Sequence, residues 1–227
     1  MCLQVDLIPF DAKEHLSDLF SISNGSACYA HRPYDAEAEI WRHLDEGPFP
    51  DAETMGRAAC MRQDKDLTDG RRFVVKDRAS GYYAGMLSLR CNCPSSLRVE
   101  LADIWITPAF QRTHGHTDAC LTILRHLFQL QYRRVECLLD AQNARGRRSL
   151  ERLGFVLEGV LRKHRIVRDS NQDSALYAMT NSDWRGGTEA KILQCLRPPS
   201  GVSSPSARTK LEEQEKKKKV KATSITR

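Results

Sequence analysis

Glu100-Leu-Ala-Asp-Ile-Trp-Ile-Thr-Pro108, followed by Ala109-Phe-Gln-Arg-Thr-His-Gly-His-Thr117, is the stretch from which the fold of this chain can be read. Its first half has the apolar character of a strand that stops at Pro108, and its second half leads into a helix. A loop with Arg112 and Gly115 at a helix N-terminus offers free backbone N–H groups and the positive end of the helix dipole. The stretch therefore predicts either a binding site for a pyrophosphate or an ordinary strand–helix loop.

Regular patterns continue on the C-terminal side of this stretch. Apolar residues recur at helical spacing from about Thr117 to Gln131, which predicts a helix that packs on a sheet. Alternation then predicts a strand, a short helix closed by a glycine, and two last strands. We place these elements at Val135 to Leu139, at Ala144 to Leu153 with Gly154 after it, at Phe155 to Val167, and at Ala175 to Thr180.

The N-terminal side adds strands and helices in a similar alternation. Residues 3–7 alternate as a strand, and Asp11 is suited to cap a helix that ends near Phe20. Helical segments at 34–44 and 51–62 follow, with Gly47-Pro-Phe-Pro50 between them, and a hairpin then joins strands at 73–76 and 82–90. The order of these elements predicts a mixed α/β domain.

The composition predicts one soluble domain. A chain of 227 residues with 41% hydrophobic residues can bury a single core. The N-terminus lacks the pattern of a secretory signal, and charges interrupt every apolar stretch before the roughly 18 residues that a membrane span needs. We therefore expect a cytoplasmic location and no membrane partner. The eight scattered cysteines predict reduced thiols, and the Cys91-Asn-Cys93 pair lacks the spacing of a zinc site, so we expect no metal.

The last thirty residues differ from the rest. Residues 198–227 begin with Pro198-Pro-Ser-Gly201 and have too little apolar surface to fold, so we expect a domain at 1–197 and a disordered basic tail. The tail carries a net charge of +5 out of +6 for the chain, so nucleic acid is an unexpected partner except through the tail. A lysine cluster in the tail is either a nuclear localisation signal, an RNA-binding arm or a solubilising end; it consists of Lys216 to Lys219 with Lys221.

Several segments resemble a known family. Ile104 to Thr113, with Thr117-Asp-Ala119, is similar to the acetyl-CoA loop and following helix of GNAT superfamily N-acetyltransferases in the RimJ/RimL-like branch. Asp140-Ala-Gln-Asn143 and Glu151-Arg-Leu-Gly-Phe155 resemble the family's segment that ends in an N-x(9)-L-G-F pattern. The resemblance covers about residues 3–185 and excludes the tail. It implies the GNAT fold, a mixed central sheet of about seven strands flanked by helices.

The resemblance also implies acetyl-CoA as the co-substrate. Family members splay a pair of parallel strands and lay the pantetheine arm in the gap; the open edge here would be Asp103 to Thr107. The pyrophosphate would lie on the amides of Arg112 to Thr117. Asn143 has the paired donor and acceptor to hydrogen-bond the arm, although asparagine after a strand is also a common turn residue. The cofactor-binding residues expected from the resemblance are Ile104, Trp105, Ile106, Gln111, Arg112, Thr113, His114, Gly115, His116, Thr117, Asn143 and Arg148.

Acetyl transfer needs a base for the amine, a donor for the oxyanion and an acid for the leaving thiolate. The resemblance gives Glu100 the role of base, directly or through a water, and gives the oxyanion to a backbone N–H near Ile106. Strand parity predicts that Asp103 does not share a face with Glu100, so its role is open. Many relatives carry serine where this chain has Gly146. The acid therefore stays open among Ser149, Tyr177 and a water.

The acceptor site is expected at the helical segments before the sheet. By the same resemblance, residues 34–62 would form the acceptor wall with Trp41 and Phe49 as apolar lining, although aromatic residues are more often core. The expected activity is direct acetyl transfer in a ternary complex to a primary amine, either a protein N-terminal α-amine or a small-molecule amine. Two alternatives stay open: a catalytically silent acyl-CoA-binding module, and a nucleic-acid-binding protein acting through its tail.

Overall fold

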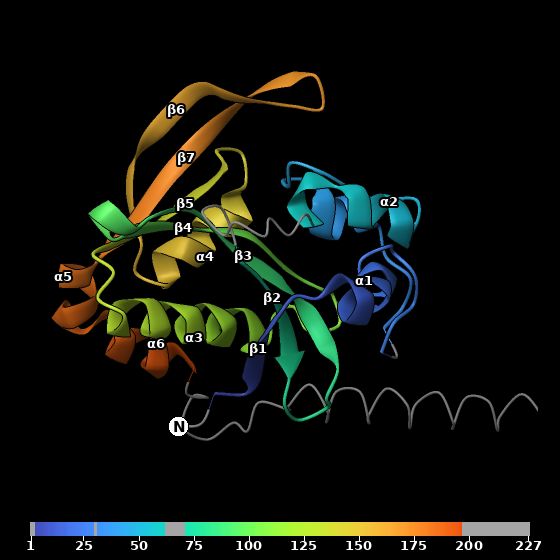
Figure 1. Cartoon of the computed structure of the whole chain (residues 1–227), viewed down its shortest axis with the longest axis horizontal. Coiled ribbons are helices and arrows are strands. Elements are labelled where there is room, and N and C mark those ends of the chain that lie inside the picture. Colours follow the sequence, from blue (N-terminus) through green and yellow to red (C-terminus); the bar gives the residue numbers. More distant parts are fainter. Residues whose placement is uncertain (1–2, 30, 62–70, 197–227) are drawn as a thin grey trace, which may run out of the picture.

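The computed structural model describes residues 3–29, 31–61 and 71–196. Its centre is a seven-stranded sheet in the order β1-β2-β3-β4-β5-β7-β6 (Figure 1). Neighbouring strands are antiparallel except β4 and β5, which are parallel. The mixed sheet predicted from the sequence is thereby confirmed. The strands are β1 Val5–Pro9, β2 Arg71–Asp77, β3 Tyr83–Cys93, β4 Arg98–Ile106, β5 Arg134–Asp140, β6 Val156–Val167 and β7 Ser170–Thr180.

The helices begin where the sequence places capping residues. The Asp11 side chain accepts hydrogen bonds from the amides of Lys13 and Glu14, as expected for an N-cap. Asp51 caps the next α-helix through the amide of Thr54. The α-helices are α1 Ala12–Ser21, α2 Ala52–Arg57, α3 Gly115–Gln129, α4 Ala144–Arg152, α5 Asn181–Asp183 and α6 Glu189–Leu196; shorter turns are η1 Glu37–Trp41, η2 Ala59–Met61, η3 Pro94–Ser96 and η4 Trp184–Thr188.

The helical segments before the sheet are shorter than predicted. Of residues 34–44, only Glu37–Trp41 form a helix, and it is a single π-helical turn. The helix predicted at 51–62 ends at Arg57, because Ala58 adopts an extended backbone with ψ 149°. The predicted end at residue 62 lies outside the described residues. The segment between these helices, residues 42–51, is therefore irregular.

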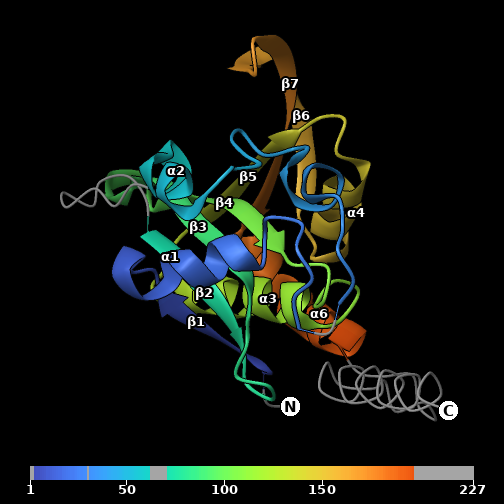
Figure 2. The same ribbon diagram turned by 90° about the vertical axis from the view of Figure 1, so that its right-hand side faces the viewer.

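Apolar residues on alternate strand positions form one core on each face of the sheet. Val75 and Leu87 belong to a core with α3 and α6, whereas Val74 and Met86 belong to a second core with α1, η1 and α2. We call these the α3 face and the α1 face. Figures 1 and 2 show the two sets of helices on different sides of the strands. Each fully buried aliphatic side chain contributes about 1.5–3 kcal/mol to the free energy of unfolding.

A β-bulge in β4 reverses which residues point to which face. Met86 pairs with Trp105 and Ser88 pairs with Ala102, so β4 has one residue more than β3 over this interval. Asp103 lies in the bulge with φ of 49°. Before the bulge Leu101 packs in the α3-face core, and after it Trp105 packs in the α1-face core.

β4 and β5 pair only at their beginnings. Their parallel register runs from Arg98 opposite Arg134 to Glu100 opposite Glu136, and no register pair follows among the described residues. The Cys137 thiol donates to the Leu101 carbonyl at 2.8 Å just beyond the last pair. The strands then diverge, which leaves the rest of β4 with an unpaired edge toward β5.

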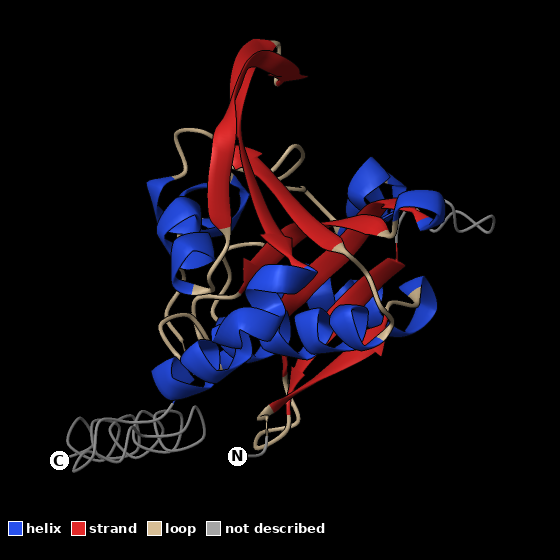
Figure 3. Cartoon of the chain, turned by 90° about the vertical axis from the view of Figure 1, so that its left-hand side faces the viewer, coloured by secondary structure: helices blue, strands red, loops and turns tan. Residues whose placement is uncertain are grey.

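A long hairpin of β6 and β7 projects from the sheet, as Figure 3 shows at the top of the molecule. Its tip is hydrogen-bonded to residues 41–47. Arg168 donates to the Trp41 carbonyl at 3.0 Å and to the Gly47 carbonyl at 2.6 Å. Arg165 donates to both carboxylate oxygens of Asp45. The hairpin and residues 41–47 therefore close over the α1 face of β4 and β5.

The predicted tail at 198–227 lies outside the described residues, as does Arg197. Among the helices that the structure describes, none combines the length and apolar character needed to cross a bilayer. Within the same residues, no group of three or more His, Cys, Asp or Glu side chains is arranged to hold a metal ion.

Candidate functional site

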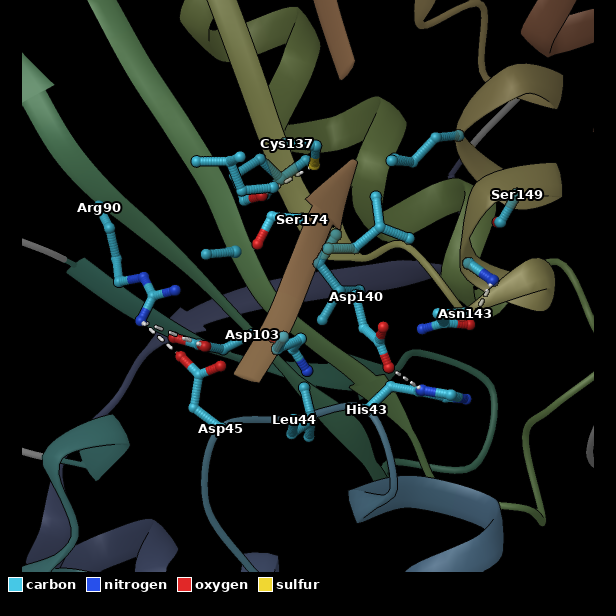
Figure 4. Close-up of a pocket in the computed structure, with 18 of the residues that line it drawn as sticks. His43, Leu44, Asp45, Arg90, Asp103, Cys137, Asp140, Asn143, Ser149 and Ser174 are labelled. Atoms are coloured by element: carbon cyan, nitrogen blue, oxygen red, sulfur yellow. Dashed lines mark hydrogen bonds and ion pairs between the residues drawn. The ribbon is translucent and has the colours of Figure 1, made fainter. Parts of the chain in front are cut away.

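A cavity of about 120 Å³ lies where β4 and β5 diverge. It crosses the sheet, because its lining comes from α4 on the α3 face and from residues 43–45 on the α1 face. Figure 4 shows these side chains around the gap. The residues on which the site depends are His43, Asp45, Arg90, Asp103, Ile104, His116, Cys137, Asp140, Asn143, Gly146, Ser149, Arg165 and Ser174.

At the α3-face end, Asn143 and Gly146 shape the cavity wall. Asn143 is the N-cap of α4, and its Oδ1 accepts from the Gly146 amide at 2.7 Å. This bond leaves the Asn143 Nδ2 group as a donor at the cavity. A Cβ on residue 146 would lie 2.9 Å from both Asn143 Nδ2 and Leu139 Cδ1. The glycine at position 146 therefore keeps this end of the cavity open.

The loop between β4 and α3 is a tight turn that presents amide groups. The amides of Phe110 and Gln111 donate to the Thr107 carbonyl, and Arg112 takes a left-handed backbone with φ of 58°. The Thr113 hydroxyl donates to the Phe110 carbonyl and accepts from the Gly115 amide. Within the described residues, the amides of Arg112, Thr113, His114, His116 and Thr117 have no hydrogen-bond acceptor. Such an array at a helix N-terminus suits a phosphate.

His116 faces the cavity from the first turn of α3. Its Nδ1 lies 3.4 Å from the Ser149 hydroxyl and its ring lies beside the Cys120 thiol. Burial lowers the pKa of His116 to about 4, with smaller contributions from Arg152 and Arg145. His116 is therefore neutral at pH 7 and brings no positive charge to the loop.

The low pKa of His116 predicts that acid destabilises the protein. An unfolded histidine has a pKa of about 6.5, so the unfolded state binds more protons between about pH 6.5 and 4. The free energy of unfolding should fall by up to about 3 kcal/mol as the pH falls through this window. Denaturant titrations at several pH values would show this slope for the wild type and a smaller one for His116→Gln. His126→Gln, at an exposed position of α3, is the control; an unchanged slope in His116→Gln would contradict the assignment.

At the α1-face end, two arginines lie among three carboxylates. Arg90 lies 3.6 Å from Asp103, 3.7 Å from Glu100 and 4.0 Å from Asp45. Arg165 lies 3.8 Å from Glu100 and 2.8 Å from Asp45. Burial alone would lower the pKa of Arg90, but the carboxylates of Asp103, Glu100 and Asp45 outweigh it and raise that pKa. Arg90 therefore stays charged at the cavity.

A histidine–aspartate pair lies between the two ends. The His43 Nδ1 atom is 2.7 Å from Asp140 Oδ2, and Asp140 Oδ1 accepts from the Gln142 amide. Asp140 is the last residue of β5, and Figure 4 shows the pair at the edge of the gap. With Nδ1 bound to a carboxylate, Nε2 of His43 is the nitrogen that can accept a proton.

The cavity contains some of the residues predicted for the cofactor site. Ile104, His116 and Asn143 line it, as does the candidate acid Ser149. Trp105 and Ile106 are buried in the two cores instead, and the exposed Arg148 lies outside the lining. The Gln111 side chain braces the loop by donating to the Ile106 carbonyl and accepting from Arg145.

Several predicted catalytic and substrate residues lie away from the cavity. Glu100 is buried behind Arg90 and Arg165 and does not line it. Tyr177 is buried in the α3-face core, where its hydroxyl donates to Glu151. Trp41 packs against Trp105 and Phe49, so these two expected lining residues belong to the α1-face core. Large aromatic rings gain more from burial than from lining a polar cavity, which explains this difference.

Asp103 lies on the same side of the sheet as Glu100, so the prediction from strand parity was wrong. That prediction assumed a regular strand, in which residues 100 and 103 point to opposite faces. The bulge adds one residue, and both carboxylates therefore approach Arg90 on the α1 face.

Asp45, Arg90 and the His43–Asp140 pair were not predicted from the sequence. The sequence nevertheless contained an indication of these residues. Arg90 is a charged residue at the end of an apolar strand, and His43 and Asp45 closely follow Trp41.

Comparisons with known proteins agree with this architecture. The family described as "Acetyltransferase (GNAT) domain" matches residues 10–156. A curated relative from Bacillus subtilis (strain 168), named "Putative ribosomal N-acetyltransferase YdaF", is 28% identical over 126 residues, which is 55% of this chain and 67% of that protein.

Two solved structures are similar over most of the chain. A GCN5-related N-acetyltransferase from Brucella melitensis has a TM-score of 0.77 and 28% identity, covering 94% of this chain and 92% of its own. A probable acetyltransferase of the GNAT family from Chromobacterium violaceum ATCC 12472 has a TM-score of 0.70 and 28% identity, covering 82% and 87%.

Proposed function

Because the chain belongs to the GNAT acetyltransferase family, we propose that it is an N-acetyltransferase that moves an acetyl group from acetyl-CoA to a primary amine. The observation that carries this proposal is the cavity between β4 and β5. One end of it meets the amide-rich start of α3, and the other end holds ionisable side chains that can receive an amine and its proton.

Three features of the α3-face end fit acetyl-CoA. The unpaired edge of β4 offers backbone groups to the amides of a pantetheine arm. Gly146 leaves the space that a side chain would fill, and Asn143 Nδ2 is a donor beside that space. The acceptor-free amides from Arg112 to Thr117 suit the pyrophosphate. Once bound, acetyl-CoA supplies the thioester that makes the acetyl group reactive.

The proposed reaction is direct transfer. The lone pair of a neutral amine attacks the thioester carbon, a C–N bond forms, and the C–S bond breaks. The amine nitrogen loses one proton to a base, and the thiolate takes up one proton from an acid. Glu100 is the proposed base and acts through an intervening water, because it does not line the cavity. Ser149 is the proposed acid, because it does line the cavity and can regain its proton from solvent.

We further propose the RimJ/RimL-like branch and a cytoplasmic location. The relative whose name describes a ribosomal N-acetyltransferase supports a protein N-terminal α-amine as one acceptor class. Small-molecule amines are the other class. The basic tail is proposed as an accessory segment that adds a nuclear address or a contact with RNA without contributing to acetyl transfer.

The test of this function is a titration of acetyl-CoA into the full chain, followed by addition of a panel of amines with release of free thiol recorded. We expect saturable acetyl-CoA binding and thiol release with at least one amine. Binding without release from any peptide or small amine would favour a silent acyl-CoA-binding module. Absence of binding would overturn the proposal.

Arg112→Gly should weaken acetyl-CoA binding without destabilising the protein. The left-handed backbone of Arg112 costs about 1 kcal/mol for a residue with a Cβ, and glycine removes that cost. Loss of the guanidinium beside the free amides should raise the Kd of acetyl-CoA about tenfold. Calorimetry and thermal melting measure the two effects. Asp169→Gly, at φ of 59° in the hairpin, is the matched control and should leave the Kd unchanged; an unchanged Kd in Arg112→Gly would exclude it from the site.

A further inference from the structure

Asp103 differs from the other acidic residues at the cavity. Both oxygens of Asp45 accept from Arg165, and both oxygens of Asp140 are hydrogen-bonded to His43 or the Gln142 amide. Asp103 Oδ2 is buried and has no hydrogen-bond partner within the described residues; Glu100 Oε1 shares this state, but only Asp103 of the two lines the cavity. An unpaired buried carboxylate oxygen costs free energy, so its presence beside a cavity points to a ligand that donates to it.

The contact with Arg90 does not satisfy Asp103. The nearest guanidinium nitrogen of Arg90 lies 3.6 Å from Asp103 Oδ1, which is beyond hydrogen-bond distance. Asp103 Oδ2 accepts no hydrogen bond from Arg90 either. Arg90 is also shared with Glu100 and Asp45. Asp103 is therefore held near a positive charge that is already divided among three carboxylates.

The backbone at Asp103 is strained as well. Its φ of 49° lies in the left-handed region, which residues with a Cβ adopt infrequently, although Asp and Asn do so more often than the others. The bulge that imposes this conformation turns the carboxylate to the α1 face and places it next to Ile104, where β4 and β5 have diverged. Strain of this kind is found most often at binding and catalytic sites.

The charge around Asp103 also favours a cation. Four carboxylates, those of Asp45, Glu100, Asp103 and Asp140, face two guanidinium groups at this end of the cavity. These six groups together carry a formal charge of −2. His164 is exposed and outside the lining, and its Nδ1 lies 3.0 Å from the hydroxyl of Ser174, which does line the cavity. An ammonium group therefore gains from the site, whereas an anion would add to the repulsion.

We propose that Asp103 receives the amino group of the acceptor in its ammonium form through Oδ2. This inference rests on the proposed function for the identity of the ligand, and it deepens that function by naming the acceptor class. The acceptor is a primary amine that is protonated in water and carries no carboxylate beside the amino group. Asp103 is then a positioning and specificity residue, which holds the ammonium nitrogen near the thioester until it passes one proton to water and becomes the neutral amine that attacks.

The test uses butane-1,4-diamine, which is doubly protonated at pH 7, and the neutral butane-1,4-diol of similar shape. Each is titrated into the full chain, with and without saturating CoA. We expect the wild type to bind the diamine and not the diol. Asp103→Asn keeps the side-chain shape, and asparagine tolerates positive φ. This variant should raise the Kd of the diamine tenfold or more, leave the Kd of acetyl-CoA within about twofold, and melt no lower than the wild type.

Asp169→Asn makes the same chemical change at a residue with φ of 59° outside the cavity, and it should bind the diamine like the wild type. Equal diamine binding by Asp103→Asn and wild type, or absence of binding to the wild type, would overturn the inference. A lower melting temperature in Asp103→Asn with unchanged diamine binding would show a structural role instead. Loss of acetyl-CoA binding or of thiol release in the wild type would count against the proposed function alone, since diamine binding is measured without turnover.

Discussion

Glu100→Gln is expected to lower the turnover of acetyl transfer by about 100-fold or more while leaving the Kd of acetyl-CoA within about twofold. Glutamine cannot accept the proton that reaches residue 100 through a water. The residue is also remote from the α3-face end where acetyl-CoA is proposed to bind. Turnover across about pH 6–9 and calorimetric titration of acetyl-CoA measure the two quantities.

His43→Gln is the matched variant, because His43 lines the cavity beside Asp140 and its Nε2 can accept a proton. If Glu100→Gln keeps full activity over that pH range and His43→Gln loses it, the base is the His43–Asp140 pair. Glu100 is also the counter-charge of Arg90 and Arg165. The melting temperature of Glu100→Gln must therefore be recorded, and activity compared well below it.

Gly85→Ala is expected to lower the free energy of unfolding by about 3 kcal/mol or more. Gly85 lies on β3 opposite Ile106 on β4. A Cβ at this position would lie 2.0 Å from the Trp105 carbonyl oxygen and 2.9 Å from the Ile106 Cα. Both atoms belong to the backbone, so no side-chain rotation relieves the contact and β4 itself must move.

Chemical denaturation measures this loss, and Gly159→Ala on β6 is the control because a Cβ there has no neighbour within 4 Å. Movement of β4 should also weaken acetyl-CoA binding, since the unpaired edge lies on the same strand. A Gly85→Ala protein as stable as the wild type would show that β3 and β4 are less closely packed than the structure indicates.

The local elements of this fold were predictable because each is determined by nearby residues. Asp11 caps α1 through amides two and three residues away, and the turn between β2 and β3 is set by its own short sequence. The amide-rich loop before α3 could be placed for the same reason. A resemblance to a family then supplied a mixed central sheet of about seven strands, which local patterns do not determine.

The bulge at Asp103 could not be predicted in this way. It arises from the register between β3 and β4, a pairing that strand periodicity does not specify. The same limitation applies to the acceptor end. Residues 34–62 were predicted to form it, but only packing decides that Trp41 turns inward while His43 and Asp45 face the cavity.

The passage of the cavity through the sheet has a kinetic consequence. If acetyl-CoA approaches from the α3 face and the amine from the α1 face, neither ligand blocks the route of the other. Free CoA should then inhibit competitively against acetyl-CoA but not against the amine. Spent CoA can also be exchanged for a fresh molecule while a slowly dissociating acceptor remains in place, so a large protein acceptor would not limit the rate at which the enzyme is recharged.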